Sequence, residues 1–189
     1  QDTYKDELLA PFLGNHDTMR PGSFMPGEEK VKMAAGVMAM MSGGCFVYYG
    51  EEIGMISKGG NTSDPAKRIA MKWQAKNIYE GCCYLPPENT PVDETSYYYP
   101  SVEEQLNDPD SILCYYRNAM QLRNKYAAIP RGAVEYFPEG QSNYTCILKK
   151  TYKDDSVVIV FNMDSFDQTV TLDSAALGIN EKADELLVD

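Results

Sequence analysis

The sequence predicts an α/β unit followed by a small all-β unit. Two short apolar segments flank an amphipathic helical segment, which predicts a strand–helix–strand arrangement. A second amphipathic segment predicts another helix. Beyond Pro130-Arg131-Gly132 the hydrophobic period changes to two, which predicts the strands of an antiparallel sheet.

The first unit starts at Pro11–Gly14, a short apolar segment that stops at a polar cluster. Glu28–Met41 has apolar residues at helical spacing, and Cys45–Tyr49 is a second short, β-prone segment. Strand, helix and strand in this order imply a parallel pair. Two parallel strands alone leave both edges unpaired, so we expect strands outside this chain to complete the sheet.

The middle of the chain, Ile56–Pro100, is predicted to be irregular, as in a functional loop or one that wraps a neighbour. Ile112–Tyr126 is predicted to be an amphipathic helix, with capping residues just before it. Four strands are predicted after it: Val134–Phe137, Tyr144–Leu148, Val157–Phe161 and Gln168–Leu172.

Composition excludes several functional classes. The 189 residues carry a net charge of −11, which disfavours binding to nucleic acid, and they contain no apolar run long enough to span a membrane. Five cysteines without regular spacing argue against a disulfide framework, and a single histidine argues against a zinc site. The 14 tyrosines suit either sugar binding or ordinary packing, and composition alone favours packing.

The candidate site is the cluster Asn15-His16-Asp17, which follows the first predicted strand and includes the only histidine. Asp17 could stabilise developing positive charge, and His16 could donate hydrogen bonds to a hydroxylated substrate. The alternative is a helix N-cap, since Asn and Asp are good capping residues, and spacing alone favours this alternative because short Asn/Asp clusters are common.

Glu51-Glu52 follows the second predicted strand. Neighbouring residues of a strand point to opposite faces, so these two carboxylates do not form an acid–base pair by themselves. A supporting salt bridge or a cap is the favoured interpretation.

Several motifs of this sequence resemble those of glycoside hydrolase family 13, the α-amylase family. The matching segments, which occur in the family's order, are Phe12–Arg20, Tyr48–Met55, Arg68–Trp73, Val102–Leu113, and the pairs Tyr116-Arg117 and Leu122-Arg123. Arg68–Trp73 is similar to the family's Arg-x-x-Met-x-Trp motif, although Ala70 stands where many members have proline. That motif is typical of the α-glucosidase, oligo-1,6-glucosidase and neopullulanase-like branch.

The resemblance implies that residues 1–132 are the C-terminal portion of a catalytic (β/α)8 TIM barrel. Residues 133–189 would then be a β-sandwich domain, called domain C. The resemblance also implies that Asp17 stabilises the transition state, and that His16, Arg20 and Asn15 lie around the same sugar. The substrate class would be α-glucans and maltooligosaccharides of starch.

The family's nucleophilic Asp and acid/base Glu belong to segments upstream of residue 1. A barrel of this type needs roughly 250 residues, so the chain is expected to be a fragment whose partner is the missing N-terminal part of the same enzyme. Retaining hydrolysis needs two carboxyl groups about 5 Å apart, so the chain alone is expected to be inactive.

Three other interpretations stay open: a transglycosylase or isomerase of the same family, a non-catalytic carbohydrate-binding or transport-partner relative, and a purely structural domain. No metal site is predicted. Calcium is left open, because acidic loop residues are plentiful but no EF-hand-like spacing occurs. Localisation is also open, with extracellular, cell-envelope and cytoplasmic sites all compatible.

Overall fold

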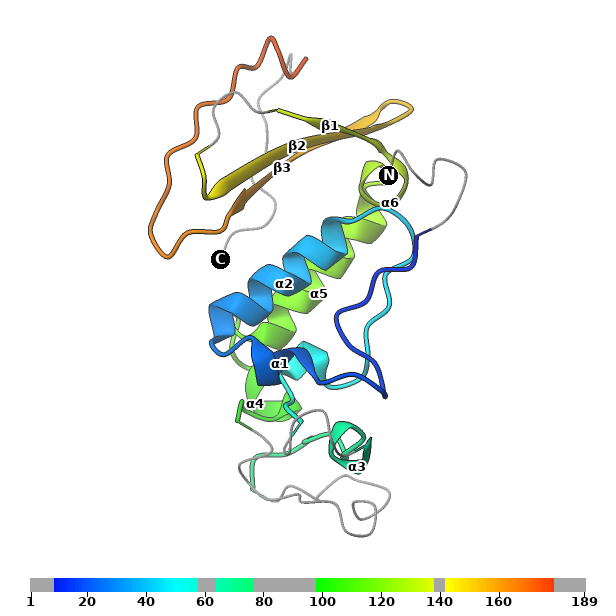
Figure 1. Cartoon of the computed structure of the whole chain (residues 1–189), viewed down its shortest axis with the longest axis vertical. Coiled ribbons are helices and arrows are strands. Elements are labelled where there is room, and N and C mark those ends of the chain that lie inside the picture. Colours follow the sequence, from blue (N-terminus) through cyan, green and yellow to red (C-terminus); the bar gives the residue numbers. More distant parts are fainter. Residues whose placement is uncertain (1–8, 58–63, 77–97, 138–141, 179–189) are drawn as a thin grey trace.

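A pair of helices packed side by side forms the centre of the computed structural model, which describes residues 9–57, 64–76, 98–137 and 142–178. The pair consists of α2 (Glu28–Met40) and α5 (Ile112–Lys125) (Figure 1). Their apolar faces meet in one buried cluster, which consists of Val31, Ala35 and Met38 of α2, Ile112 and Tyr116 of α5, and Tyr99 from the segment before α4 (Val102–Leu106). Both helices match the sequence prediction to within one residue at each end.

The two helices approach closely at Gly36. A Cβ atom at this position would lie 2.6 Å from the Tyr115 hydroxyl oxygen, which is too close for any real contact. Gly36 therefore leaves room for the Tyr115 hydroxyl of α5 to lie directly against α2.

The predicted strands at Pro11–Gly14 and Cys45–Tyr49 meet in a single parallel bridge between Phe12 and Phe46. Phe46 N donates to Pro11 O at 3.0 Å. The predicted parallel pairing is therefore present, but each strand is reduced to one bridged residue. In the part of the chain that the structure describes, neither segment has another strand beside it to extend the pairing.

Short helices connect these parts. They are α1 (Pro21–Phe24), the 3-10 helix η1 (Glu51–Ile53), α3 (Asp64–Lys67), α4 (Val102–Leu106) and α6 (Ala128–Arg131). Helix α4 was not predicted from the sequence, although Ser101 and Glu104 form a capping box at its start. Ser111 caps α5 in turn by accepting a hydrogen bond from Cys114 N at 3.2 Å.

The C-terminal part is one antiparallel sheet in the order β1–β2–β3. Its strands are β1 (Ala133–Tyr136), β2 (Thr145–Tyr152) and β3 (Asp155–Asn162). The register pairs Tyr152 with Asp155, so a two-residue turn joins β2 to β3. Three of the four predicted strands are confirmed in this sheet.

The prediction of a strand at Gln168–Leu172 is wrong. Its alternating β-branched residues suit a strand, but a strand also needs a partner edge, and this segment pairs with none of the described strands. The described residues hold a single sheet, so a second layer, which a sandwich requires, stays a prediction.

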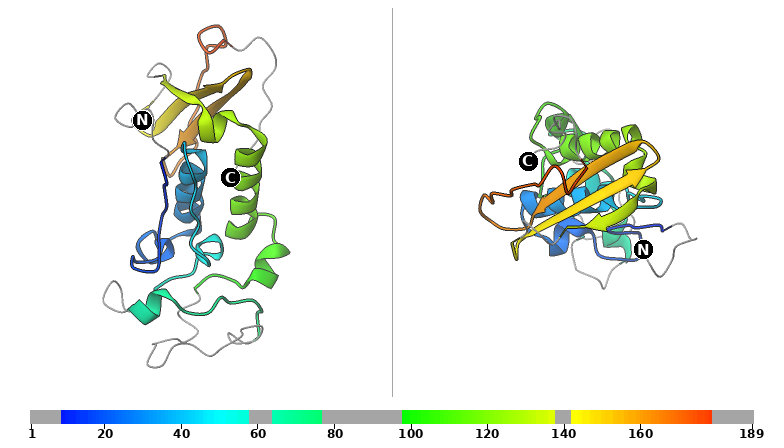
Figure 2. Two further views of the ribbon diagram at one scale, coloured as in Figure 1. Left: turned by 90° about the vertical axis from the view of Figure 1, so that its right-hand side faces the viewer. Right: turned by 90° about the horizontal axis from the view of Figure 1, so that it is seen from above.

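The sheet covers the ends of the two central helices (Figure 2). A second buried cluster spans helices and sheet and contains Ala39, Met40, Ala119, Ile129 and Ile159. Side chains of β2 and β3, including Leu148 and Val157, pack against it. Apolar contact therefore holds the sheet directly on the helices.

Two buried cations bind the carbonyl groups at the C-terminal end of α2. Arg123 Nη1 donates to Ala39 O at 2.7 Å and to Met41 O at 2.5 Å. Lys150, on β2, is fully buried and donates to Met40 O at 2.9 Å and to Ile129 O. The last carbonyl groups of a helix lack partners within the helix and carry partial negative charge, so the two cations satisfy them.

Replacing Lys150 with methionine is expected to change how stability depends on pH. Burial, together with nearby Arg123, lowers the pKa of Lys150 to about 8, whereas the unfolded side chain has a pKa of about 10.4. Between these values the unfolded chain binds more protons, so this lysine makes stability rise with pH.

Urea unfolding between about pH 7 and pH 10 tests this prediction over the interval in which the proton is lost. The variant Lys150→Met should lose the rise that this lysine contributes. The control variant Lys149→Met changes the neighbouring position, which faces the other side of β2. Equal pH dependence in both variants would contradict the assignment.

Candidate active-site segment

The polar cluster after Phe12 is a compact turn organised by Asn15. Its side-chain Oδ1 accepts from Asp17 N at 2.8 Å and from Thr18 N at 3.0 Å. Asn15 N donates to Thr18 Oγ1 at 2.9 Å. Asn15 therefore closes a turn. The alternative interpretation, a helix N-cap, is wrong, because the next helix, α1, begins only at Pro21.

This turn holds His16 and Asp17 next to one another. The His16 Nε2 atom lies 3.2 Å from Asp17 Oδ2. In this chain both side chains are open to solvent, with exposed fractions of 62% and 64%. The turn therefore presents an imidazole and a carboxylate side by side on an ordered backbone.

Residues of the α3 region contact this turn from about fifty positions further along the chain. Arg68 Nη2 lies 3.0 Å from Asp17 Oδ1, and Arg68 Nε donates to His16 O at 3.2 Å. Lys67 Nζ donates to Asp17 O at 2.9 Å. Asp64 joins the two cations, at 3.1 Å from Lys67 Nζ and 3.3 Å from Arg68 Nη2.

Arg20 lies three residues after Asp17 and is fully buried. Its Nε donates to Lys67 O at 3.0 Å, and its Nη1 donates to Tyr49 O at 2.6 Å. The guanidinium carbon lies 4.7 Å from the ring centroids of both Tyr48 and Tyr49. Among the described residues its contacts are with protein groups that support the turn, and its predicted place in a sugar subsite stays a prediction.

Glu51 and Glu52 lie in η1 and are not part of the turn that carries His16 and Asp17. Glu51 is buried, and the Tyr116 hydroxyl donates to its Oε1 at 3.4 Å. One oxygen of each carboxylate is buried without a hydrogen-bond partner among the described residues. Burial raises the pKa of Glu52 and raises that of Glu51 to about 7.

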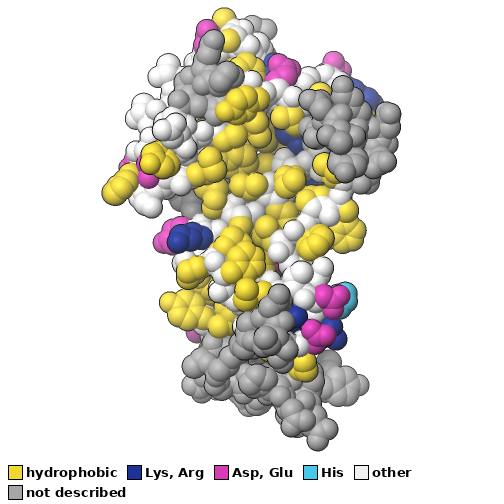
Figure 3. Space-filling model, viewed as in Figure 1, with side chains coloured by type: hydrophobic (Ala, Val, Ile, Leu, Met, Phe, Trp, Pro, Cys, Tyr) yellow, Lys and Arg dark blue, Asp and Glu magenta, His cyan; other side chains and the backbone are white. Residues whose placement is uncertain are grey.

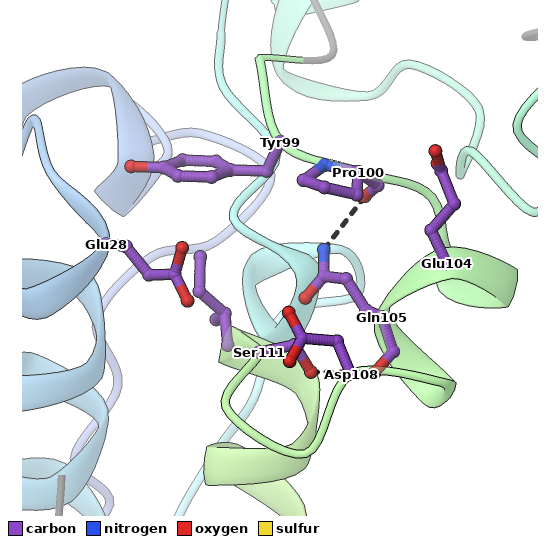
Figure 4. A pocket seen from close by; sticks show the side chains of 8 residues that line it. Glu28, Tyr99, Pro100, Glu104, Gln105, Asp108 and Ser111 are labelled. Atoms are coloured by element: carbon purple, nitrogen blue, oxygen red, sulfur yellow. Dashed lines mark hydrogen bonds between the residues drawn. The ribbon is translucent and has the colours of Figure 1, made fainter.

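A cavity of about 140 Å³ lies between the N-terminal ends of α2 and α5 (Figure 4). Glu28, Tyr99, Glu104, Gln105 and Asp108 are among its lining residues. None of the predicted site residues lines this cavity. Gln105, which does line it, already donates a hydrogen bond to Pro100 O at 2.8 Å. We therefore assign the candidate site to the turn and not to this cavity.

Comparison with known proteins gives the family. The family profile described as "Alpha amylase, catalytic domain" matches residues 1–132, which is more than half of the chain. The chain belongs to the α-amylase family. The resemblance found in the sequence motifs is thereby confirmed.

Relatives of this α-amylase family chain include Alpha-amylase 3 of Dictyoglomus thermophilum, 29% identical over 163 residues, or 85% of this chain and 31% of that enzyme. Alpha-amylase SusG of Bacteroides thetaiotaomicron is 33% identical over 129 residues, or 67% of this chain and 18% of that enzyme. The solved structure of Eubacterium rectale Amy13B matches with a TM-score of 0.80 at 32% identity, covering 95% of this chain and 34% of that one.

The family contains more than one activity. A 4-alpha-glucanotransferase of Thermotoga maritima and a trehalose synthase of Thermus thermophilus are also among the relatives. The chain spans 31%, 37% and 18% of the length of the first three curated relatives. These relatives are enzymes, and the N-terminal part of the chain is related to the family's (β/α)8 barrel.

The contacts of Lys67 and Arg68 with Asp17 are not evident from the sequence. Arg68 is the first residue of a family motif, and no motif includes Lys67. The available signal was a short segment that begins with the acidic Asp64 and is followed by two cations, the last residue of α3 and Arg68 directly after it. It gives no indication of which segment the cations contact.

The described residues contain no group of His, Cys, Asp or Glu side chains suited to a metal ion. Within the same residues, no helix is long and apolar enough to cross a membrane. Cys45, Cys114 and Cys146 have free thiols, whereas Cys82 and Cys83 lie outside the described residues.

Replacing Glu51 with glutamine is expected to stabilise the protein increasingly as pH rises. The unfolded side chain has a pKa of about 4.3, below the value of about 7 in the folded chain. Between these values the folded chain binds more protons, so this carboxyl makes stability fall as pH rises. The glutamine variant loses that contribution.

Chemical denaturation at about pH 4.5 and pH 8 measures the effect, which should reach about 3 kcal/mol in favour of Glu51→Gln. The exposed Glu103 on α4 provides the control, as Glu103→Gln. The prediction fails if the two variants follow the same pH dependence.

Proposed function

We propose that this chain is the C-terminal part of a retaining α-glucan hydrolase of the α-amylase family. In this proposal the whole enzyme cleaves α-glucosidic bonds of starch-derived oligosaccharides, and Asp17 supplies one of its catalytic carboxylates. The observation that carries the proposal is the ordered turn that presents His16 beside Asp17 at the end of the segment paired with Phe46.

The chemistry follows from this placement. Glycoside cleavage passes through an oxocarbenium-like state, in which positive charge builds up at the anomeric carbon. A fixed carboxylate stabilises that state more than the neutral ground state, which lowers the barrier. We assign this role to Asp17, with His16 donating to a hydroxyl of the same sugar and Asn15 fixing the turn that carries both.

The nucleophile and the general acid belong, in this proposal, to barrel strands upstream of residue 1. Residues 1–132 complete the barrel and residues 133–189 form domain C as a β-sandwich. The motif that starts at Arg68 favours the α-glucosidase and neopullulanase-like branch.

An exposed apolar surface supports the proposal that upstream segments complete the barrel. Phe12 and Phe46, which form the parallel bridge, are 52% and 61% exposed. Val37, Met41 and Val47 are exposed as well, and apolar side chains cover much of the face shown in Figure 3. Large contiguous apolar surfaces usually lie against other protein, and here we assign them to the upstream barrel segments.

Replacing Asp17 with asparagine in the full-length enzyme is expected to lower kcat by about 100- to 1,000-fold or more. The variant keeps the size of the side chain but loses the charge that stabilises the transition state. Reducing-sugar release from maltooligosaccharides measures the loss. The control variant Asp110→Asn changes an exposed residue in the turn before α5, and full activity of Asp17→Asn would contradict the proposal.

The chain by itself is expected to release no sugar, because Asp17 alone cannot provide both the nucleophile and the acid. The same assay, run on the isolated chain and on the full-length enzyme, tests this. Turnover by the isolated chain above background would contradict it.

A glucanosyl transferase or isomerase is the second candidate, favoured by the relatives named 4-alpha-glucanotransferase and trehalose synthase. Such an enzyme shares the covalent intermediate but passes the sugar to an acceptor other than water. Chromatography of the products from maltooligosaccharides distinguishes longer or isomerised sugars from shorter hydrolysis products. A non-catalytic relative would give neither.

A further inference from the structure

We propose that Lys67 and Arg68 are positioning residues that hold Asp17 in its reactive orientation. The inference rests on the role proposed above for Asp17. It assigns a function to the segment Asp64–Arg68, which the family motif marks only by its arginine. Neither cation is proposed to contact the reacting atoms.

The two cations hold the turn by its backbone and by its carboxylate. Lys67 Nζ binds Asp17 O at 2.9 Å, and Arg68 Nε binds His16 O at 3.2 Å. Arg68 Nη2 binds Asp17 Oδ1 at 3.0 Å. One short segment thus binds the backbone carbonyl groups of His16 and Asp17 and also the Asp17 carboxylate.

The segment Asp64–Arg68 is itself held by hydrogen bonds and ion pairs. Lys67 O accepts from Arg20 Nε at 3.0 Å, so the residue that holds Asp17 is held by the arginine three positions after Asp17. Asp64 bridges the two cations. Its hydrogen bond to Lys67 and the charges of both cations lower the pKa of the Asp64 carboxyl, which keeps the bridge charged. Lys67 thus binds Asp17 through its ammonium group and Arg20 through its carbonyl group, and Arg20 follows Asp17 by three residues in the chain.

The arrangement leaves Asp17 able to bind a sugar. An ionised carboxylate has about four acceptor positions. Arg68 occupies one on Oδ1, and His16 lies against Oδ2. The remaining positions can accept sugar hydroxyls while the carboxylate plane stays fixed, which is what transition-state stabilisation requires.

The contacts of Arg68 are solvent-exposed, and exposed ion pairs add little to the free energy of unfolding. Their loss should therefore leave the fold intact and show itself in catalysis. This separates a positioning role from a purely structural one.

The test uses the full-length enzyme with Arg68→Ala, Arg68→Lys and the exposed control Arg117→Gln. Arg68→Ala is expected to lower kcat by about 10- to 100-fold with little change in KM, because a small misplacement of a catalytic group has effects of this size. Arg68→Lys should recover part of the loss. Added ethylguanidinium should raise the activity of Arg68→Ala but not that of the control.

The Asp17→Asn variant separates the two proposals. If it retains activity, the proposed function fails. If Asp17→Asn is inactive while Arg68→Ala keeps its natural kcat, only the positioning role fails. A rise in kcat/KM of Arg68→Ala would also overturn it, because Arg68 would then compete with the substrate for the carboxylate.

Discussion

The packing of α2 against α5 is the constraint on which the remaining structure depends. Close approach at Gly36 brings the helices together along Val31, Ala35 and Met38. Arg123 of α5 binds the carbonyl groups at the C-terminal end of α2. The chain that follows leads to Phe46, which forms the parallel bridge with Phe12. The segment that carries the candidate site is thus joined to the helix pair through this bridge.

The same helix end also receives the sheet. Lys150 reaches from β2 into the space beyond α2 and binds carbonyl groups of two different helices. Apolar contacts of Ile159 and Ile129 surround this link. Helices and sheet therefore share one interior, although the family profile ends at residue 132. Packing is therefore continuous across the position at which the family match ends.

Local signals allowed much of this fold to be predicted from the sequence. The period of Ile112–Tyr126 and the capping serine before it place α5 correctly, because helix formation depends on neighbours a few residues apart. The strand predicted at Gln168–Leu172 is wrong, since alternation describes a strand's faces but not the partner it needs. Asp17 was predicted as a site residue from its motif. Its contact with Lys67 was not predicted, because the hydrogen bond from Lys67 to Asp17 O joins residues fifty positions apart.

Arg20 illustrates how narrow the chemical requirement at a buried cation can be. Its two donors reach carbonyl groups on separate segments, Lys67 O and Tyr49 O, while its flat face lies near two tyrosine rings. A lysine presents all its donors from a single nitrogen, whereas Arg20 donates from two separate nitrogens held in one plane, and a lysine has no flat face to lie against the tyrosine rings. Replacing Arg20 with lysine keeps the charge but loses these contacts. At this position lysine is therefore not a conservative substitution.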